Sequence, residues 1–290
     1  MNTGIVGIGL MGRAFVERFQ SQGFTVSVFN RTRDAVKDLE ESGVVVCDSI
    51  EELIDTTDTI ILMVSNADAI REVLSLDQPE GEASGLRGKT ILQMATISPS
   101  QSIALDEAVT SIGGRYLEAP VLGSLPEARN GTLIIMAGGA QAVFEDALPV
   151  LQVLGSAPRY IGKTGSGAAL KLAMNQLIAA LTAGFSLSLG YARKHGVDTD
   201  LFMDTVRESA LYAKTYDKKL EKYLSRDFGK ANFSTRHLLK DVRLFIDDAK
   251  AAGLNTAALE GIEEITRQTV EEGYDVMDYS SIYRTIVPED

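Results

Sequence analysis

The segment 4-GIVGIGLMG-12 joins a short apolar run to a stretch with the periodicity of an amphipathic helix. Its glycines fall in a G-x-G-x-x-G pattern, in which Gly7 makes a tight turn, Gly9 allows a pyrophosphate to approach the backbone, and Gly12 lets the helix pack on the strand. The phosphates then meet unpaired N–H groups at the helix N-terminus. The pattern predicts a dinucleotide site, and a glycine-rich turn without a ligand is the alternative. The predicted site comprises Gly7, Ile8, Gly9, Leu10, Met11 and Gly12.

The end of the next strand-like run, Thr25–Phe29, indicates which dinucleotide is bound. A site selective for NAD usually has a carboxylate there for the ribose 2′-hydroxyl, and this chain has Asn30-Arg31-Thr32 instead. Asn30 does not repel a 2′-phosphate, Arg31 can bind it, and Thr32 can donate a further hydrogen bond. We therefore expect NADP (NADPH) rather than NAD, unless Arg31 is only a solvated loop residue. Met63 and Val64, which end another strand-like run, are included in the predicted cofactor site.

The first part of the chain alternates β-branched runs with amphipathic stretches, which predicts a parallel sheet with helices on both faces. The expected strands are Gly4–Gly7, Thr25–Phe29, Thr59–Val64, Thr90–Met94 and Arg115–Glu118, with Leu133–Ala137 and Pro158–Ile161 as further sheet. The expected helices are Gly12–Gln22, Arg33–Ser42, Ser49–Asp55, Ala67–Leu74, Pro99–Ile112 and Ala140–Leu154.

From Ser166 onward the strand pattern stops, and the remaining periodic stretches predict helices. The expected fold class is α/β, with a doubly wound sheet in residues 1–162 and an all-α domain in residues 163–290. The expected helices are Ser166–His195, Asp200–Ala213, Tyr216–Tyr223, Ser234–Ala252 and Ala257–Glu272.

Composition limits the classes of function. The 290 residues carry a formal net charge of −12, which disfavours nonspecific binding of nucleic acid or of an anionic membrane. The stretch Leu170–Ala192 is long enough to span a bilayer, but polar residues interrupt it. Cys47 is the single cysteine, so we expect a reducing compartment, the cytoplasm. No cluster of histidine, cysteine and carboxylates has the spacing of metal ligands, and we expect no metal.

A lysine stands out in the apolar stretch 165-GSGAALKLAMN-175. Lys171 and Asn175 are four residues apart and share a face if the stretch is helical. The positive end of the helix and partial burial are both expected to lower the pKa of Lys171, which makes it a better proton donor near neutrality. The alternative is a lysine whose stem lies along a core helix while its ammonium reaches solvent.

These motifs together resemble the β-hydroxyacid dehydrogenase family, which includes 3-hydroxyisobutyrate dehydrogenases and glyoxylate/succinic semialdehyde reductases. The resemblance runs nearly end to end, through GIVGIGLMG, EAPVLGSLPEARNGTLIIMAGG, GKTGSGAALKLAMN and FSTRHLLKDVRL. It implies a Rossmann-type first domain, a homodimer or homotetramer, and Lys171 as the catalytic acid/base with Asn175 as its partner. Asn30-Arg31-Thr32 and PEARNGTL look most like the glyoxylate/succinic semialdehyde reductase branch.

The resemblance also implies how substrate and cofactor are held. It assigns the substrate carboxylate to Val121, Leu122, Gly123 and Ser124, and places Thr96 and Lys240 at the cofactor. Simpler roles remain open: Thr96 as a helix cap, Lys240 and Asp241 as a solvated pair, and Asn175 as a hydrogen bond between helices.

One departure bears on the substrate, because family members commonly carry serine where this chain has Leu122. Losing that hydroxyl costs about 1.5–3 kcal/mol if no other donor, such as Ser124, replaces it. The expected reaction is NADPH-dependent reduction of a short aldehyde acid. The alternatives are an oxidative 3-hydroxy acid dehydrogenase, a nucleotide-binding module without turnover, and an imine reductase, a class that generally lacks the lysine.

Overall fold

The computed structural model describes residues 2–77 and 83–289, and the chain divides into two compact units, residues 1–172 and 173–290. The division falls inside one long helix, α8 (Ser166–Lys194). The boundary that the sequence predicts, after residue 162, lies before this helix. The first turn of α8 belongs with the first unit because the backbone N–H groups of Gly167 and Ala168 donate to the Glu118 side chain.

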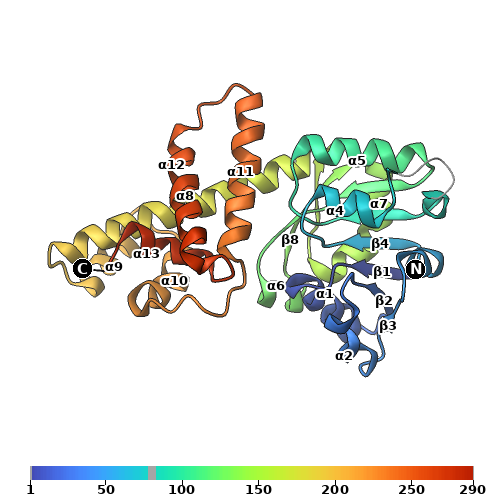
Figure 1. Ribbon diagram of the computed structural model, residues 1–290, viewed down its shortest axis with the longest axis horizontal. Coiled ribbons are helices and arrows are strands. Elements are labelled where there is room, and N and C mark those ends of the chain that lie inside the picture. The colour runs from blue at the N-terminus through green and yellow to red at the C-terminus, as the bar shows by residue number, and fades with distance from the viewer. Residues whose placement is uncertain (1, 78–82, 290) are drawn as a thin grey trace. The chain divides into compact units, whose positions relative to one another are not determined.

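The first unit contains a nine-stranded sheet with the order β3-β2-β1-β4-β5-β6-β8-β7, and β9 pairs with β8 (Figure 1). The strands from β3 to β6 are parallel, which confirms the parallel sheet expected from the first five predicted strands. The further sheet expected at 133–137 is β8, which runs antiparallel to β6 and β7. The strands are β1 (Thr3–Val6), β2 (Val26–Phe29), β3 (Val45–Val46), β4 (Thr59–Leu62), β5 (Thr90–Gln93), β6 (Arg115–Glu118), β7 (Val121–Leu122), β8 (Ile134–Gly139) and β9 (Arg159–Gly162).

Helices follow most of these strands, as expected for a doubly wound fold, and each expected strand and helix of this unit has a counterpart within a few residues. The sequence analysis missed β3, β7 and the short helix that follows β7, because two to six residues are too few to show a period. The helices are α1 (Leu10–Ser21), α2 (Lys37–Glu40), α3 (Ile50–Thr56), α4 (Ala67–Val73), α5 (Pro99–Ser111), α6 (Leu125–Asn130) and α7 (Gln141–Leu154), with short 3-10 turns at Arg33–Ala35 and Ala83–Leu86.

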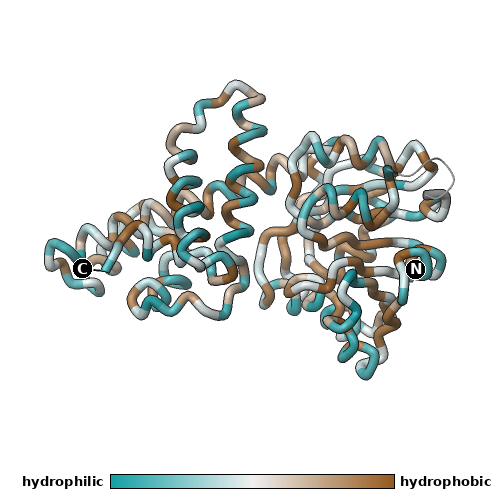
Figure 2. Tube along the Cα trace, viewed as in Figure 1, coloured by the Kyte–Doolittle hydropathy of each residue, from teal (hydrophilic) through white to brown (hydrophobic). Residues whose placement is uncertain are grey.

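The central strands send alternate side chains into two separate apolar clusters. On β1, Ile5 packs with α1 and α7 on one face, and Val6 packs with α3, α4 and α5 on the other. Ile61 and Ile60 divide in the same way on β4. Because both faces are covered, β1 and β4 are buried at every position and mostly apolar, and they are largely brown in Figure 2.

The second unit is helical, and α8 supplies the side chains around which it packs. α8 is long and apolar enough to cross a membrane by length and composition alone, a test that the core helices of soluble proteins also pass, and 44% of its most apolar window is buried. The next helix ends at Glu208 rather than at the expected Ala213. The other elements are α9 (Thr199–Glu208), α10 (Lys214–Ser225), α11 (Thr235–Ala251), α12 (Ala257–Thr269), a π turn at Val270–Tyr274, a 3-10 turn at Tyr279–Ser281 and α13 (Ile282–Ile286).

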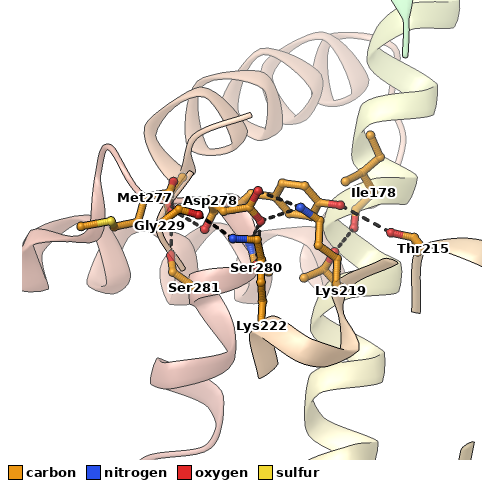
Figure 3. A network of polar contacts seen from close by, with 12 residues as sticks. Ile178, Thr215, Lys219, Lys222, Gly229, Met277, Asp278, Ser280 and Ser281 are labelled. Atoms are coloured by element: carbon orange, nitrogen blue, oxygen red, sulfur yellow. Dashed lines mark hydrogen bonds and ion pairs between the residues drawn. The ribbon is translucent and has the colours of Figure 1, made fainter. Parts of the chain in front are cut away.

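A buried ion pair joins α10 to the turn before α13 (Figure 3). Lys219 Nζ lies 2.7 Å from both carboxylate oxygens of Asp278, whose side chain is only 1% exposed. The same carboxylate accepts from the backbone N–H and the hydroxyl of Ser280, and Lys219 Nζ lies 4.4 Å from the ring centre of Tyr279. Burial lowers the pKa of Lys219, and the neighbouring carboxylate partly opposes that shift.

Candidate active site

The three glycines after β1 are constrained in different ways. Gly7 has a φ of +89°, and a Cβ there would lie 2.5 Å from the carbonyl oxygen of Met63. A Cβ on Gly12 would lie 2.1 Å from the carbonyl oxygen of Gly7. A Cβ on Gly9 would meet no protein atom within 4 Å. Protein packing therefore requires glycine at positions 7 and 12, whereas the open space at Gly9 suits the close approach of a ligand.

The start of α1 fits an anion. Gly9 is the N-cap of this helix and supplies no side-chain hydrogen bond, so the first N–H groups of α1 are left to water or a ligand. In the sheet, β1 lies between β2 and β4. The order of the strands reverses between β1 and β4, and doubly wound sheets bind dinucleotides at this switch point. These residues fit the pyrophosphate of a dinucleotide. Leu10, which is 61% exposed, and the partly buried Met11 form the first turn of α1.

The Asn30 side chain ties the glycine-rich turn to the end of β2. Its Oδ1 accepts from the backbone N–H of Ile8 at 3.0 Å, and its Nδ2 donates to the carbonyl oxygen of Thr32 at 2.9 Å. Thr32 and Arg31 are exposed, and within residues 2–77 and 83–289 Arg31 has no hydrogen bond or ion pair. The neighbouring Arg33, by contrast, is paired with Glu40 and Asp48. The guanidinium of Arg31 is therefore available to an anion.

The end of β4 also borders this turn in the sheet, and β5 is the next strand beyond β4. Met63 donates its backbone N–H to the carbonyl oxygen of Val6 at 2.9 Å, and Met63 and Val64 are both partly buried. Thr96 is partly buried after β5. The suggestion that Thr96 caps the next helix is wrong, because Ser98 is the N-cap of α5 and forms a capping box with Gln101.

The segment expected to hold a substrate carboxylate is more ordered than a loop. Val121 and Leu122 form β7 and pair with Ile135 and Ile134 of β8. Gly123 has a φ of +136°, and a Cβ there would lie 2.7 Å from Leu133 Cδ2. The backbone N–H of Ser124 donates to Glu127 at 2.8 Å. That N–H is already bonded within the protein, so it is not an open donor for a substrate.

Lys171 and Asn175 both lie on α8, as expected, and their spacing places them on one face of the helix. Lys171 is partly buried and belongs to the first unit, whereas Asn175 belongs to the second unit and is only 2% exposed. Asn175 Nδ2 donates to Asp241 Oδ2 at 2.7 Å, so the amide nitrogen links α8 to α11. Among the described residues, Asn175 Oδ1 is buried without a hydrogen bond.

Lys240 and Asp241 are not a solvated pair. Lys240 Nζ lies 3.1 Å from Asp241 Oδ1, and the Asp241 side chain is only 3% exposed. The alternative in which Lys240 and Asp241 form a solvated pair is therefore wrong. An aspartate on the apolar side of α11, beside Leu238 and Val242, was the signal that it faces inward.

Glu118 is a second buried carboxylate that sequence reasoning missed. It ends β6, is fully buried, and accepts hydrogen bonds from the backbone of α8 and from the Ser102 hydroxyl. Burial raises the pKa of Glu118, and the hydrogen bonds from Ser102, Ala168 and Gly167 oppose that shift. The signal in the sequence was a charged residue that ends an otherwise buried strand.

The structure shows where the possible metal ligands lie. Among the described residues, no three side chains of histidine, cysteine, aspartate or glutamate lie together as a metal site would require. His195 lies beside Tyr191 near the end of α8, with 4.4 Å between the ring centres. His237 Nδ1 is hydrogen-bonded to the Ser234 hydroxyl at 2.8 Å.

A doubly wound sheet with this glycine-rich turn at its switch point, followed by a helical unit, defines a nicotinamide-dependent oxidoreductase. Residues 2–162 match the family model for the NAD binding domain of 6-phosphogluconate dehydrogenase. Residues 165–286 match the model described as NAD-binding of NADP-dependent 3-hydroxyisobutyrate dehydrogenase. The chain belongs to the β-hydroxyacid dehydrogenase family.

Three relatives illustrate the range of this similarity. Glyoxylate/succinic semialdehyde reductase 1 of Arabidopsis thaliana is 32% identical over 288 residues, which cover 99% of this chain and 98% of the relative. The crystal structure of 3-hydroxyisobutyrate dehydrogenase from Salmonella typhimurium shares the fold with a TM-score of 0.84 and 24% identity, covering 98% of this chain and 99% of that one. An imine reductase from Myxococcus stipitatus in complex with NADP+ has a TM-score of 0.65 and 20% identity, covering 99% of this chain and all of that one.

Proposed function

We propose that this protein is an NADPH-dependent reductase of short aldehyde acids, of the glyoxylate or succinic semialdehyde type. The relative with 32% identity is named for these substrates and matches this chain along nearly its whole length. The observation that carries the proposal is the position of Lys171, a partly buried lysine on α8 in the unit that contains the dinucleotide turn.

The cofactor would be held by the turn Gly7–Gly12 and the first N–H groups of α1, with Asn30, Arg31 and Thr32 at the adenosine ribose. Thr96, Met63, Val64 and Lys240 remain the further predicted contacts. When bound, NADPH supplies a hydride, which the carbonyl carbon of the substrate accepts. The preference for NADP over NAD is part of the proposal. It is supported by the exposed guanidinium of Arg31 and by an amide, rather than a carboxylate, at Asn30.

The chain itself supplies the proton and the orientation. As the carbonyl is reduced, negative charge develops on its oxygen, and the ammonium of Lys171 stabilises this charge and donates a proton, which leaves a hydroxy acid and a neutral amine. Asn175 would help to orient the substrate oxygen. Val121, Leu122, Gly123 and Ser124 remain the predicted carboxylate site, although the N–H of Ser124 is bonded to Glu127.

The test follows the loss of NADPH absorbance with glyoxylate, succinic semialdehyde and other short oxo-acids. Lys171→Met should lower kcat by about 100-fold to 10,000-fold, the usual contribution of a positioned acid, with the Kd for NADPH unchanged. NADPH binding by the wild-type protein without turnover of any carbonyl would contradict the proposal and favour a nucleotide-binding module.

A second candidate is the oxidation of a 3-hydroxy acid on the same site. It is favoured by the match of residues 165–286 to a model described by NADP-dependent 3-hydroxyisobutyrate dehydrogenase. In this direction neutral Lys171 accepts the hydroxyl proton. Comparing kcat/KM for the oxidation of 3-hydroxy acids with that for the reduction of aldehyde acids distinguishes the two candidates. Reduction of cyclic imines in the same assay would indicate the imine reductase alternative.

We also propose that the protein forms a homodimer or homotetramer through its helical unit. The side chains of Leu177, Leu187 and Tyr191 on α8 are 44%, 62% and 67% exposed, which is unusual for large apolar residues on one helix. Light scattering should show more than one subunit per particle, and Leu187→Glu should shift the particle toward one subunit. A wild-type monomer at micromolar concentration would contradict the proposal.

The remaining expectations are a cytoplasmic location and the lack of nucleic-acid or membrane partners. They are supported by the buried thiol of Cys47 and the net charge of −12. Fractionation of cells that express the protein at its natural level tests the location.

A further inference from the structure

Glu118 stands between the two parts of the chain to which substrate binding and proton transfer are assigned. It is the last residue of β6, and the chain passes from it through Ala119 and Pro120 directly into Val121 of the predicted carboxylate site. Its side chain bonds to the first turn of α8, the helix that carries Lys171. All of these residues belong to the first unit.

The contacts of the carboxylate are short and come from several elements. Glu118 Oε1 accepts from the backbone N–H of Gly167 at 2.7 Å and from that of Ala168 at 3.3 Å. The Ser102 hydroxyl of α5 donates to Oε2 and is 2.9 Å from the hydroxyl oxygen of Tyr116. The Glu118 side chain is therefore held at both oxygens, and it connects β6 and α5 to α8.

Two glycines make room for this arrangement. A Cβ on Gly138 of β8 would lie 2.3 Å from Glu118 Oε1, and a Cβ on Gly167 would lie 2.4 Å from the carbonyl oxygen of Met136. Side chains at these positions would push the carboxylate or the helix away. A carboxylate buried among apolar residues costs stability unless it is fully hydrogen-bonded, so an apolar residue at the end of β6 would be the simpler choice for packing alone.

We propose that Glu118 is a positioning residue, which fixes the first turn of α8 against the strand that leads into the substrate segment and thereby places Lys171. The inference rests on the proposed role of Lys171 as the proton donor. Lys171 follows Gly167 by four residues, about 6 Å along a helix, and side chains on a helix lean toward its N-terminus. A shift of the first turn therefore moves the Lys171 amine by a similar amount.

The experiment compares Glu118→Gln and Glu118→Ala with the wild-type protein. Glu118→Gln keeps the shape and one acceptor, but it removes the charge and turns an N–H₂ donor toward Ser102. Glu118→Ala removes every contact. Thr57→Val is the control, because Thr57 is equally buried in the first unit and its hydroxyl donates to Leu53 on α3, away from α8. The readouts are kcat, KM, the Kd for NADPH, and amide hydrogen exchange of a peptide that covers residues 163–172.

We expect kcat to fall at least tenfold in Glu118→Gln and about 100-fold in Glu118→Ala, the usual effect of misplacing a catalytic group by about 1 Å. The Kd for NADPH should stay within about twofold, because the glycine-rich turn lies on other elements, and exchange at Gly167 and Ala168 should accelerate. Thr57→Val should leave kcat and this exchange unchanged. A kcat within about twofold of wild type in Glu118→Ala would overturn the inference, as would a proportional loss of kcat and NADPH binding.

Failure of the proposed function can be distinguished from failure of this inference. If the wild-type protein turns over no substrate, the proposed function fails. The positioning role of Glu118 is then tested by measurements that do not depend on turnover. The remaining readouts are then amide exchange and the rate at which an acylating reagent modifies Lys171, followed by mass spectrometry. Exchange and labelling that are both unchanged in Glu118→Ala would overturn the positioning role.

Discussion

Replacing Arg31 tests how the protein chooses its cofactor. In Arg31→Gln the side chain keeps polar character and loses its charge, so only a ligand with an anion at this position should notice the change. A charge-assisted hydrogen bond to a sheltered group is worth a factor of about 10–150 in affinity. Because Arg31 is exposed, solvent and salt weaken the interaction, and we expect the low end of the range, about a tenfold rise in KM for NADPH. The KM for NADH, which lacks the 2′-phosphate, should change by less than about twofold.

The matched control is Arg33→Gln, two residues further along the chain. Arg33 is 44% exposed and is already paired with Glu40 and Asp48, so its loss should affect the two cofactors equally. Initial rates with both cofactors at low and high salt give the comparison. The selectivity of the wild-type protein for NADPH should shrink as salt rises, and that of Arg31→Gln should change little. Equal effects of Arg31→Gln on NADPH and NADH would refute the assignment of Arg31 to the 2′-phosphate.

Three further predictions follow from the packing. Gly9→Ala should weaken NADPH binding but leave the melting temperature within about 2 °C of wild type, because its Cβ meets no protein atom. Gly12→Ala should lower both the melting temperature and the affinity for NADPH, because its Cβ would lie 2.1 Å from the Gly7 carbonyl oxygen. Calorimetry and cofactor titration measure the two effects, and equal stability of the two variants would contradict the packing argument. Lys219→Met should destabilise the second unit by about 3 kcal/mol, because it leaves the buried Asp278 carboxylate unpaired. Adding Asp278→Asn should restore part of this loss. Denaturant unfolding of the full chain measures both changes, and a double variant less stable than Lys219→Met would contradict the role of the ion pair. Burial raises the pKa of the Cys47 thiol above its usual value near 9.0, so above about pH 9 the folded protein keeps a proton that the unfolded chain releases, and stability should fall as pH rises further. Melting temperatures measured from pH 7 to pH 10 should therefore fall more steeply for wild type than for Cys47→Ala. Parallel curves for the two proteins would contradict this prediction.

The local pattern of the sequence predicted most of the first unit. β1, β2, β4, β5 and β6 lie where β-branched runs predicted them, because a strand buried on both faces must be apolar at nearly every position. The elements that were missed are short. β7 and α6 together cover eight residues, too few to show a period. β7 forms by pairing with β8, whereas α6 begins at a capping box of Ser124 and Glu127.

Only some of the predicted site residues could be interpreted from the sequence alone. Gly7, Gly9 and Gly12 could be interpreted from the sequence because their spacing is that of a known turn, although the carbonyl that excludes a side chain at Gly7 belongs to Met63. Thr96 and Asn175 could not be assigned in this way. Whether Thr96 capped a helix depended on which residue began α5, and the partner of Asn175 lies 66 residues away.

The sequence by itself determined that a glycine-rich turn follows β1, that a helix begins there, and that a lysine lies on a later apolar helix. These features depend on residues that are close together in the chain, and backbone conformation and helical period act at that range. Only the tertiary structure decided that β8 runs antiparallel, that Asn175 bonds to Asp241, and that Glu118 holds the start of α8. Glu118 and Gly167 are 49 residues apart, and the burial that gives their hydrogen bond its value exists only once the sheet and helices have packed.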